Sequence, residues 1–168
     1  ETRLANEPFR MAVQWVNRPN LDFRGFAGLI ASGVVRPGDP IRVLPSGKRS
    51  AIERVVTLDG DLQQASAGQS VTLTFVDEID CSRGDIIAAA ASPVEVADQF
   101  ETTIVWMADN AMLPGRPYWL KTGTSTVSAT ITNAKYQISV NTLEHLAGKT
   151  LELNAIGVCD ISLDRAIP

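Results

Sequence analysis

The sequence predicts an all-β chain that folds into two consecutive small antiparallel β-barrels or sandwiches. Apolar and polar residues alternate with a period of two in many short runs, which is typical of half-buried strands. The 12 glycines and 9 prolines are spread along the chain and separate these runs by turns. With 45% hydrophobic residues among 168, the chain can bury one large core or two small ones.

Six strands are expected in the first half of the chain. Apolar side chains occupy every second position of residues 9–16, which indicates a half-buried strand. Residues 26–35 predict the next strand, in which Gly28 and Gly33 mark a bulge or a close approach of two backbones. The remaining strands of this set are expected at residues 41–44, 51–58, 71–76 and 85–88.

The segment Arg36-Pro37-Gly38-Asp39 predicts a tight turn between two of these strands. Proline presets φ at the second position of a turn, and glycine accepts a positive φ at the third. That combination is the geometry of a type II turn, and it joins neighbouring antiparallel strands.

A change of pattern near residues 88–96 predicts a domain boundary. Four successive alanines there could begin a helix, but Pro93 disfavours helical backbone angles at Ser92. We therefore expect one barrel over residues 1–90 and a second over residues 91–168.

The second half again favours strands, with one exception. Only residues 142–147 predict a helix, which Asn141 or Thr142 can cap and Gly148 can end. The strands are expected at residues 101–107, 117–121, 126–133, 134–139 and 151–163. The tryptophans on these and earlier strands are expected in the barrel core or at a barrel interface: Trp15, Trp106 and Trp119.

The chain lacks the residue sets that catalysis or metal binding requires. His145 is the only histidine, and we expect it to be exposed or to cap the short helix. A zinc site needs about four Cys, His or carboxylate ligands at short spacing, which the chain does not supply. The acidic run Asp77-Glu78, with Asp80 nearby, lacks EF-hand spacing and predicts a solvated loop. We assign no catalytic, cofactor-binding or metal-ligating residue.

Charge and cysteine content narrow the class of protein. With 15 basic and 19 acidic residues the net charge is −4, which disfavours a general nucleic-acid binder but allows a local basic patch. Apolar runs fall short of the roughly 20 residues that span a bilayer. Cys81 and Cys159 lie far apart in sequence, which disfavours a secreted protein stabilised by disulfides and favours a location in the reducing cytoplasm. The start at Glu1, without a signal peptide, indicates a piece of a longer polypeptide.

One set of short sequence motifs is specific for a family. The run GLIASGVVRPGD over residues 28–39, followed by Ala67-Gly68-Gln69 and Arg83-Gly84-Asp85, resembles the second domain of translation-factor-type GTPases. The resemblance implies barrels of the translation-factor type.

The segments that flank these motifs distinguish one member of that group of GTPases from the others. Residues 9–25 (FRMAVQWVNRPNLDFRG) and Leu58-Asp59-Gly60-Asp61 resemble the large, GTP-binding subunit of bacterial sulfate adenylyltransferase (ATP sulfurylase). So do Ile104-Val105-Trp106-Met107 and Tyr118-Trp119-Leu120-Lys121, which fit its third domain. In some bacteria that subunit is fused to adenylylsulfate kinase, and the sequence leaves this fusion open.

The resemblance implies a scaffold role for this part of the chain. GTP hydrolysis on the large subunit would drive formation of adenylylsulfate from ATP and sulfate on a small catalytic subunit. The chain holds no P-loop, so GTP and Mg are expected on a GTPase domain outside it, and no cofactor is expected here. The partners implied are that GTPase domain and the small subunit, with no nucleic acid and no membrane.

The loop at residues 17–26 is our candidate contact surface, because arginines and phenylalanines are concentrated there: Arg18, Phe23, Arg24 and Phe26. The alternative is that these residues only shape the barrel rim. Two other functions stay open, namely an aminoacyl-tRNA carrier like elongation factor Tu and a free-standing binding module.

Family members continue beyond the equivalent of Ile167-Pro168, so we expect an incomplete second barrel with an exposed edge. Unpaired strand edges favour association. The chain is therefore predicted to dimerise or aggregate through this domain as its concentration rises, which analytical ultracentrifugation measures. A monodisperse monomer over a wide concentration range would contradict this prediction.

Overall fold

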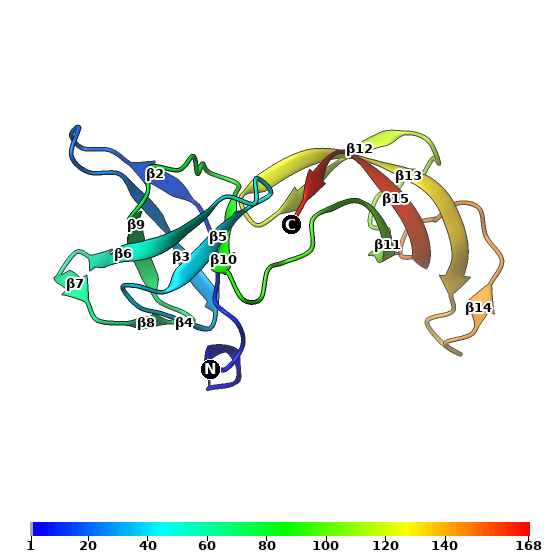
Figure 1. The fold of residues 1–168 in the computed structure, drawn as a ribbon. Helices are drawn as coiled ribbons and strands as arrows, with labels where there is room; N and C mark the ends of the chain where they lie inside the picture. Colours follow the sequence, from blue (N-terminus) through cyan, green and yellow to red (C-terminus); the bar gives the residue numbers. More distant parts are fainter. Residues whose placement is uncertain (1) are drawn as a thin grey trace. The chain divides into compact units, whose positions relative to one another are not determined.

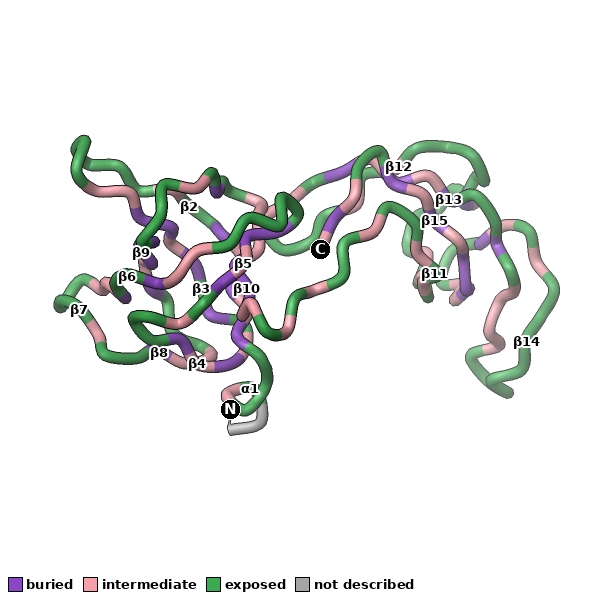
Figure 2. The backbone as a smooth tube through the Cα atoms, in the orientation of Figure 1, coloured by how far each residue is buried: buried purple, intermediate pink, exposed green. Residues whose placement is uncertain are grey.

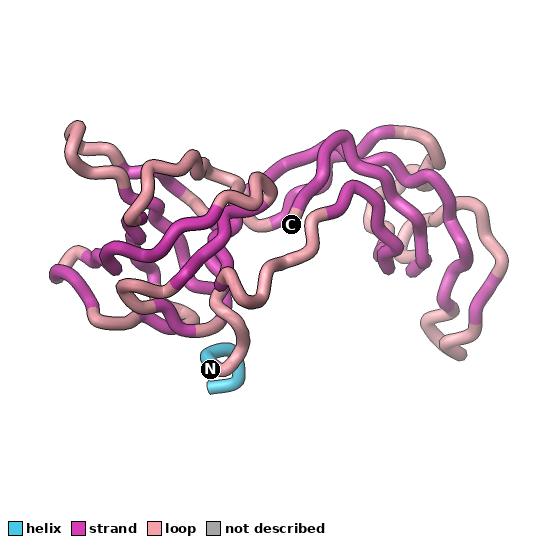
Figure 3. Tube along the Cα trace, in the orientation of Figure 1, coloured by secondary structure: helices cyan, strands magenta, loops and turns pink. Residues whose placement is uncertain are grey.

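The computed structural model describes residues 2–168 as a nearly all-β chain (Figure 1). The one helical segment of this described part is the short α1 (Thr2–Ala5) at the N-terminal end (Figure 3). Two compact units are present: one holds the residues up to Val96 with Thr122–Ser125 and Pro168, and the other holds Ala97–Lys121 and Thr126–Ile167. The predicted all-β fold class is confirmed. No helix among residues 2–168 is long and apolar enough to cross a membrane.

The first unit is a closed antiparallel barrel. Its ring runs β1-β10-β5-β6-β9-β3 and closes because β1 also pairs with β3. The ring strands are β1 (Arg10–Ala12), β3 (Gly25–Ser32), β5 (Pro40–Leu44), β6 (Arg49–Thr57), β9 (Ser70–Phe75) and β10 (Ile86–Ala89). Two shorter strands extend it, β2 (Trp15–Asn17) on β3 and β7 (Gly60–Leu62) on β6. The strands β4 (Val34–Val35) and β8 (Ala65–Ser66) form a separate two-stranded sheet.

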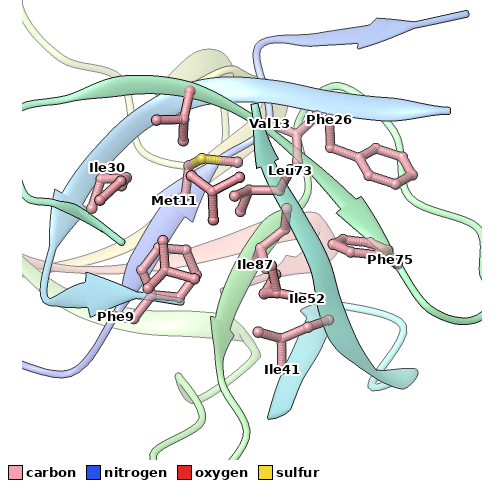
Figure 4. Packing of buried hydrophobic residues seen from close by; sticks show 14 of the residues in the cluster. Phe9, Met11, Val13, Phe26, Ile30, Ile41, Ile52, Leu73, Phe75 and Ile87 are labelled. Carbon is pink, nitrogen blue, oxygen red and sulfur yellow. The ribbon is translucent and has the colours of Figure 1, made fainter. Parts of the chain in front are cut away.

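Side chains at alternate strand positions fill the barrel. Along one row Met11 lies opposite Ile87, which lies opposite Val43, and all three are fully buried. Figure 4 shows the core, with Met11 and Ile87 among the labelled side chains. The rings of Phe26 and Phe75 stack with their centroids 4.5 Å apart. Burial alternates along the strands (Figure 2), as the period-two patterns predict.

The predicted strand over residues 9–16 is wrong in its second half. Phe9, Met11 and Val13 do face the core, but the chain then leaves β1 and pairs with β3 as β2. The amide of Gln14 donates to the Ala27 carbonyl, and the alternation breaks at this transfer. Trp15 is consequently 67% exposed, which excludes the core but not an interface as its expected place.

The predicted strand over residues 26–35 is interrupted at Gly33, between β3 and β4. Gly33 has φ +75°, and a Cβ atom there would lie 2.4 Å from the backbone nitrogen of Phe9. The turn at Arg36 to Asp39 forms as predicted, with φ +88° at Gly38 and the Asp39 amide donating to the Arg36 carbonyl.

The second unit is built on an open antiparallel sheet in the order β11-β15-β13-β12. Its strands are β11 (Ala97–Val105), β12 (Pro117–Thr122), β13 (Ser125–Ile138) and β15 (Ile156–Ile167), with β14 (His145–Leu146) paired to β13. Within the described residues β11 and β12 are therefore the edge strands. The core gathers buried side chains such as Met112, Val127, Leu151, Cys159 and Ile161.

Three expectations for this unit need correction. Residues 126–133 and 134–139 form one long strand, β13, in which two register shifts replace the expected break. Residues 151–163 do not form one strand, because Asn154 adopts φ 65° in a turn and β15 begins only at Ile156. Trp119 is 77% exposed, which excludes the core but not an interface, whereas Trp106 packs edge-on against Tyr118.

The predicted helix at residues 142–147 is wrong. The segment is the loop and second strand of the β13–β14 hairpin (Figure 3). Leu143 has φ 61°, and the Glu144 amide donates to the Thr142 hydroxyl at 3.4 Å. Such local side-chain bonds compete with helix formation, and six residues offer few helical hydrogen bonds to offset them.

Gly28 makes the close approach that the sequence predicts. An added Cβ atom would lie 2.4 Å from the Ala12 carbonyl oxygen on the neighbouring strand. We expect Gly28→Ala to lower the free energy of unfolding by about 1–3 kcal/mol, because backbone must shift to make room. Urea denaturation measures the loss.

Ala31→Ser is the matched control, since Ala31 is exposed on the same strand. Its effect should stay within about 0.5 kcal/mol. A Gly28→Ala chain as stable as this control would contradict the argument.

Candidate functional site

The β2–β3 hairpin forms one wall of a pocket in the first barrel. Asn17 pairs with Gly25 at its base, and the loop between them turns where the Asp22 amide donates to the Asn20 side-chain oxygen at 3.0 Å. Gly25 is packed so tightly that an added Cβ atom would lie 2.3 Å from the Thr72 methyl group. This close packing holds the hairpin against β9.

The pocket has a volume of about 300 Å³ and gathers all four predicted contact residues. These are Arg18, Phe23, Arg24 and Phe26. Arg18 is exposed at the rim, and Phe23 and Arg24 are half-buried. Phe26 is 1% exposed, so it is the floor of the pocket and a core residue at once. Their role in partner contact stays a prediction.

Arg24 contacts both an aromatic ring and a carboxylate at the pocket. Its guanidinium carbon lies 5.3 Å from the centre of the Phe26 ring, which is a cation–π distance. One guanidinium nitrogen lies 3.9 Å from a carboxylate oxygen of Asp80. The Nε atom of Arg24 is buried and has no hydrogen-bond partner among the described residues. An unpaired buried donor costs free energy, but the Nε atom itself is out of a partner's reach. A partner can contact only the 27% of the Arg24 side chain that is exposed.

Acidic and hydroxyl groups from two strands complete the pocket, and sequence reasoning missed them. Glu53 lies on β6, and Thr74 on β9 donates its hydroxyl proton to the Glu53 carboxylate at 2.9 Å. Asp77 and Glu78 follow β9. Only the pairing of β6 with β9 brings these residues to the hairpin, and no local sequence signal indicates that pairing.

Asp80 links the pocket to the next hairpin. The ammonium of Lys48 lies 2.9 Å from Asp80, and this hydrogen bond holds the pKa of the Asp80 carboxyl below its ordinary value. The charges of Lys48, Arg24 and Arg18 act in the same direction. The acidic run is thus a solvated loop with cationic neighbours.

The remaining reactive side chains do not form a catalytic set. His145 is exposed, as expected, and stacks on Tyr136 with ring centres 3.9 Å apart. Burial raises the pKa of the buried Cys81 thiol to about 12 and raises that of Cys159, so both stay protonated. No group of three or more potential metal ligands occurs in the part of the chain that the structure describes.

Comparison with known proteins identifies a matching family and several relatives of this chain. Residues 99–168 match a family described as GTP-eEF1A C-terminal domain-like. The bifunctional enzyme NodQ of Rhizobium sp. (strain N33) is 53% identical over 96% of this chain and 25% of its own length. Sulfate adenylyltransferase subunit 1 of Aliivibrio fischeri (strain MJ11) is 49% identical over 96% of the chain and 34% of its own length. The chain is homologous to part of sulfate adenylyltransferase subunit 1.

Further relatives agree with this assignment. The bifunctional enzyme CysN/CysC of Xylella fastidiosa (strain Temecula1) is 51% identical over 94% of this chain and 25% of its own length. The chain thus spans between a quarter and about a third of the length of these relatives.

Solved structures show the fold alone. The crystal structure of Sup35 complexed with GMPPNP superposes with a TM-score of 0.82 over 98% of this chain and 41% of its own, at 13% identity. Sup35 complexed with GDP gives a TM-score of 0.87 at 14% identity, with the same coverage. The translation-factor type of fold is confirmed.

Replacing Lys48 should make the Asp80 carboxyl easier to protonate. Lys48→Met removes the hydrogen bond that lowers its pKa, so the pKa should rise toward the ordinary value of about 3.9. A carboxyl with a lowered pKa stabilises the fold above its unfolded pKa and loses that effect as pH falls through its folded pKa. The wild-type advantage in stability should therefore be present at neutral pH and vanish in acid. NMR titration of the carboxyl carbon measures the pKa.

Lys121→Met is the control, because Lys121 is an exposed lysine of the second unit and makes none of the observed ion pairs. An Asp80 pKa that is the same in both variants would show that Lys48 does not set it.

Proposed function

We propose that the chain is the barrel region of a GTP-binding sulfate adenylyltransferase subunit in the cytoplasm. In the complete enzyme, GTP hydrolysis would drive formation of adenylylsulfate from ATP and sulfate on a small catalytic subunit. The observation that carries this proposal is identity near 50% across almost the whole chain to subunit 1 and its bifunctional relatives. GTP and Mg would bind a GTPase domain, and the barrels would supply no reacting group.

The proposed task of the barrels is docking. Related GTPases move such barrels as rigid bodies against the nucleotide-binding domain, and a partner bound to a barrel follows that movement. The pocket beside the β2–β3 hairpin suits a protein contact. It combines an apolar floor at Phe26, the partly exposed cationic side chain of Arg24, and the fully exposed side chain of Leu21 at its edge. We propose that this pocket and hairpin contact the small catalytic subunit.

An aminoacyl-tRNA carrier is the rival function for this fold. The net charge of −4 disfavours it, because binding of the phosphate backbone depends on neutralisation by lysine and arginine. The pocket lining is not basic either, because its three arginines stand beside four carboxylates, on Asp22, Glu53, Asp77 and Glu78.

Replacing Arg18 and Arg24 by alanine should weaken the contact with the small subunit. In the full-length protein we expect about a thirtyfold rise in Kd, as for loss of an arginine hot spot, and a matching loss of GTP-stimulated adenylylation. Calorimetric titration and a coupled adenylylsulfate assay measure the two effects.

Arg36→Ala is the matched control, because Arg36 is an exposed arginine in the β4–β5 turn of the same barrel. Arg18→Ala alone changes only an exposed side chain and keeps the test meaningful if the double variant unfolds. Unchanged subunit affinity in folded variants would remove the docking surface. A wild-type protein that forms no adenylylsulfate but shifts aminoacyl-tRNA with a steep salt dependence would remove the proposed function itself.

A further inference from the structure

Three arginines stand in one row across the wall of the first barrel. Arg10 on β1 lies opposite Ala88 on β10, and Ala88 lies opposite Arg42 on β5. Arg42 in turn lies opposite Arg49 on β6. Residues directly opposite in antiparallel strands project from the same face of the sheet. We call this set, Arg10, Arg42 and Arg49, the arginine row.

The arginine row lies on the outer face of the barrel. The adjacent positions along the same strands are Met11, Ile87 and Val43, which form the fully buried row of the core. Side chains alternate between the two faces of a strand, so the arginines must project outward. A small residue, Ala88, separates Arg10 from Arg42 and is fully buried between them. Arg10 and Arg42 are half-buried, and Arg49 is exposed.

The positive charges of the row are uncompensated by carboxylates of the described residues. None of the three arginines is among the observed ion pairs, all of which involve other cations. Arg10 donates only to backbone carbonyls, those of Phe9 and Ser92. These bonds fix its guanidinium at the end of the row without supplying a negative charge.

The arrangement is unfavourable for the barrel alone. Like charges directly opposite each other on neighbouring strands are destabilising, and Arg42 and Arg49 form such a pair. The Nε atom of Arg42 is also buried without a hydrogen-bond partner among the described residues. Burial further lowers the pKa of Arg10. An anion placed along the row would relieve the repulsion between Arg42 and Arg49.

We propose that the arginine row binds an acidic peptide segment of a partner protein. Neighbouring strands lie about 4.8 Å apart, so the row from β1 to β6 extends over about 14 Å. A single phosphate or sulfate is too small to reach all three guanidiniums. An extended peptide places every second side chain on one face at intervals of about 7 Å, so alternating carboxylates match this length. Arg42 and Arg49 can each take a carboxylate through two parallel hydrogen bonds. Arg10 already donates to two backbone carbonyls and contributes its charge.

A protein partner fits better than a nucleic acid. The chain carries a net charge of −4, whereas nucleic-acid-binding domains are basic as a whole. The row also holds no aromatic side chain on which a base could stack. The basic charge is thus local, as an acidic peptide requires. This site lies apart from the pocket proposed to dock the small subunit and does not depend on that proposal.

Titration with a fluorescent hexaglutamate peptide at low salt tests the arginine row. Fluorescence anisotropy should show binding to the wild-type chain. The double variant Arg42→Gln/Arg49→Gln should lose at least about tenfold in affinity, because two charge-assisted contacts disappear. The double variant Arg42→Lys/Arg49→Lys keeps both charges and should retain most of the binding. Arg116→Gln, an exposed arginine of the second unit, should bind as the wild type does.

Three results would overturn the proposal. The first is absence of hexaglutamate binding by the folded wild-type chain, and the second is equal binding by the Gln double variant. If that variant unfolds, Arg49→Gln, at an exposed side chain, takes its place and should still lose about threefold. The third is tighter binding of a single-stranded oligonucleotide through the same arginines, which would identify the partner as a nucleic acid.

Discussion

The first barrel depends on strand β1, which hydrogen-bonds to two neighbours at once. Met11 lies opposite Ile87 on β10 and opposite Ile30 on β3, so three residues of strand close the ring. Such a short strand can bridge both neighbours only where the backbones come very close. Gly28 and Gly33 allow this approach, because a side chain at either position would collide with backbone atoms. Closure leaves the ring without an open edge and seals the core.

Strand β9 connects the closed barrel to the candidate site. It pairs with β3 on one side and with β6 on the other, so Phe26, Glu53 and Thr74 meet although they are far apart in sequence. Phe26 and Phe75 stack in the core and also floor the pocket. The site therefore rests on rigid strands on one side and on a hairpin loop on the other.

Charge is distributed differently over two surfaces of the same barrel. At the pocket, cations and carboxylates alternate, and Asp80 is neighboured by Lys48 and Arg24. At the arginine row, cationic side chains face one another without a described counter-charge. The second unit follows the first pattern, since Lys135 on β13 pairs with Glu101 on β11 and Asp160 on β15. Surface ion pairs of this kind contribute little to stability. The arginine row differs from them because its charges have no carboxylate partner, and this difference indicates a binding site.

The sequence by itself determined the all-β class, the approximate position of most strands, the Arg36 to Asp39 turn and the family resemblance. Period-two alternation follows from the geometry of a strand, and the glycines and prolines of the turns act through local backbone angles, so both are readable without tertiary contacts. The same local logic failed at residues 142–147 and at Trp15, where pairing with β13 and with β3 overrode it. Only the tertiary structure decided that Arg18, Phe23 and Arg24 share a pocket with Glu53 and Thr74, and that three distant arginines form a row. Register between strands that are distant in sequence is set by the packing of the whole core, and no short segment encodes it.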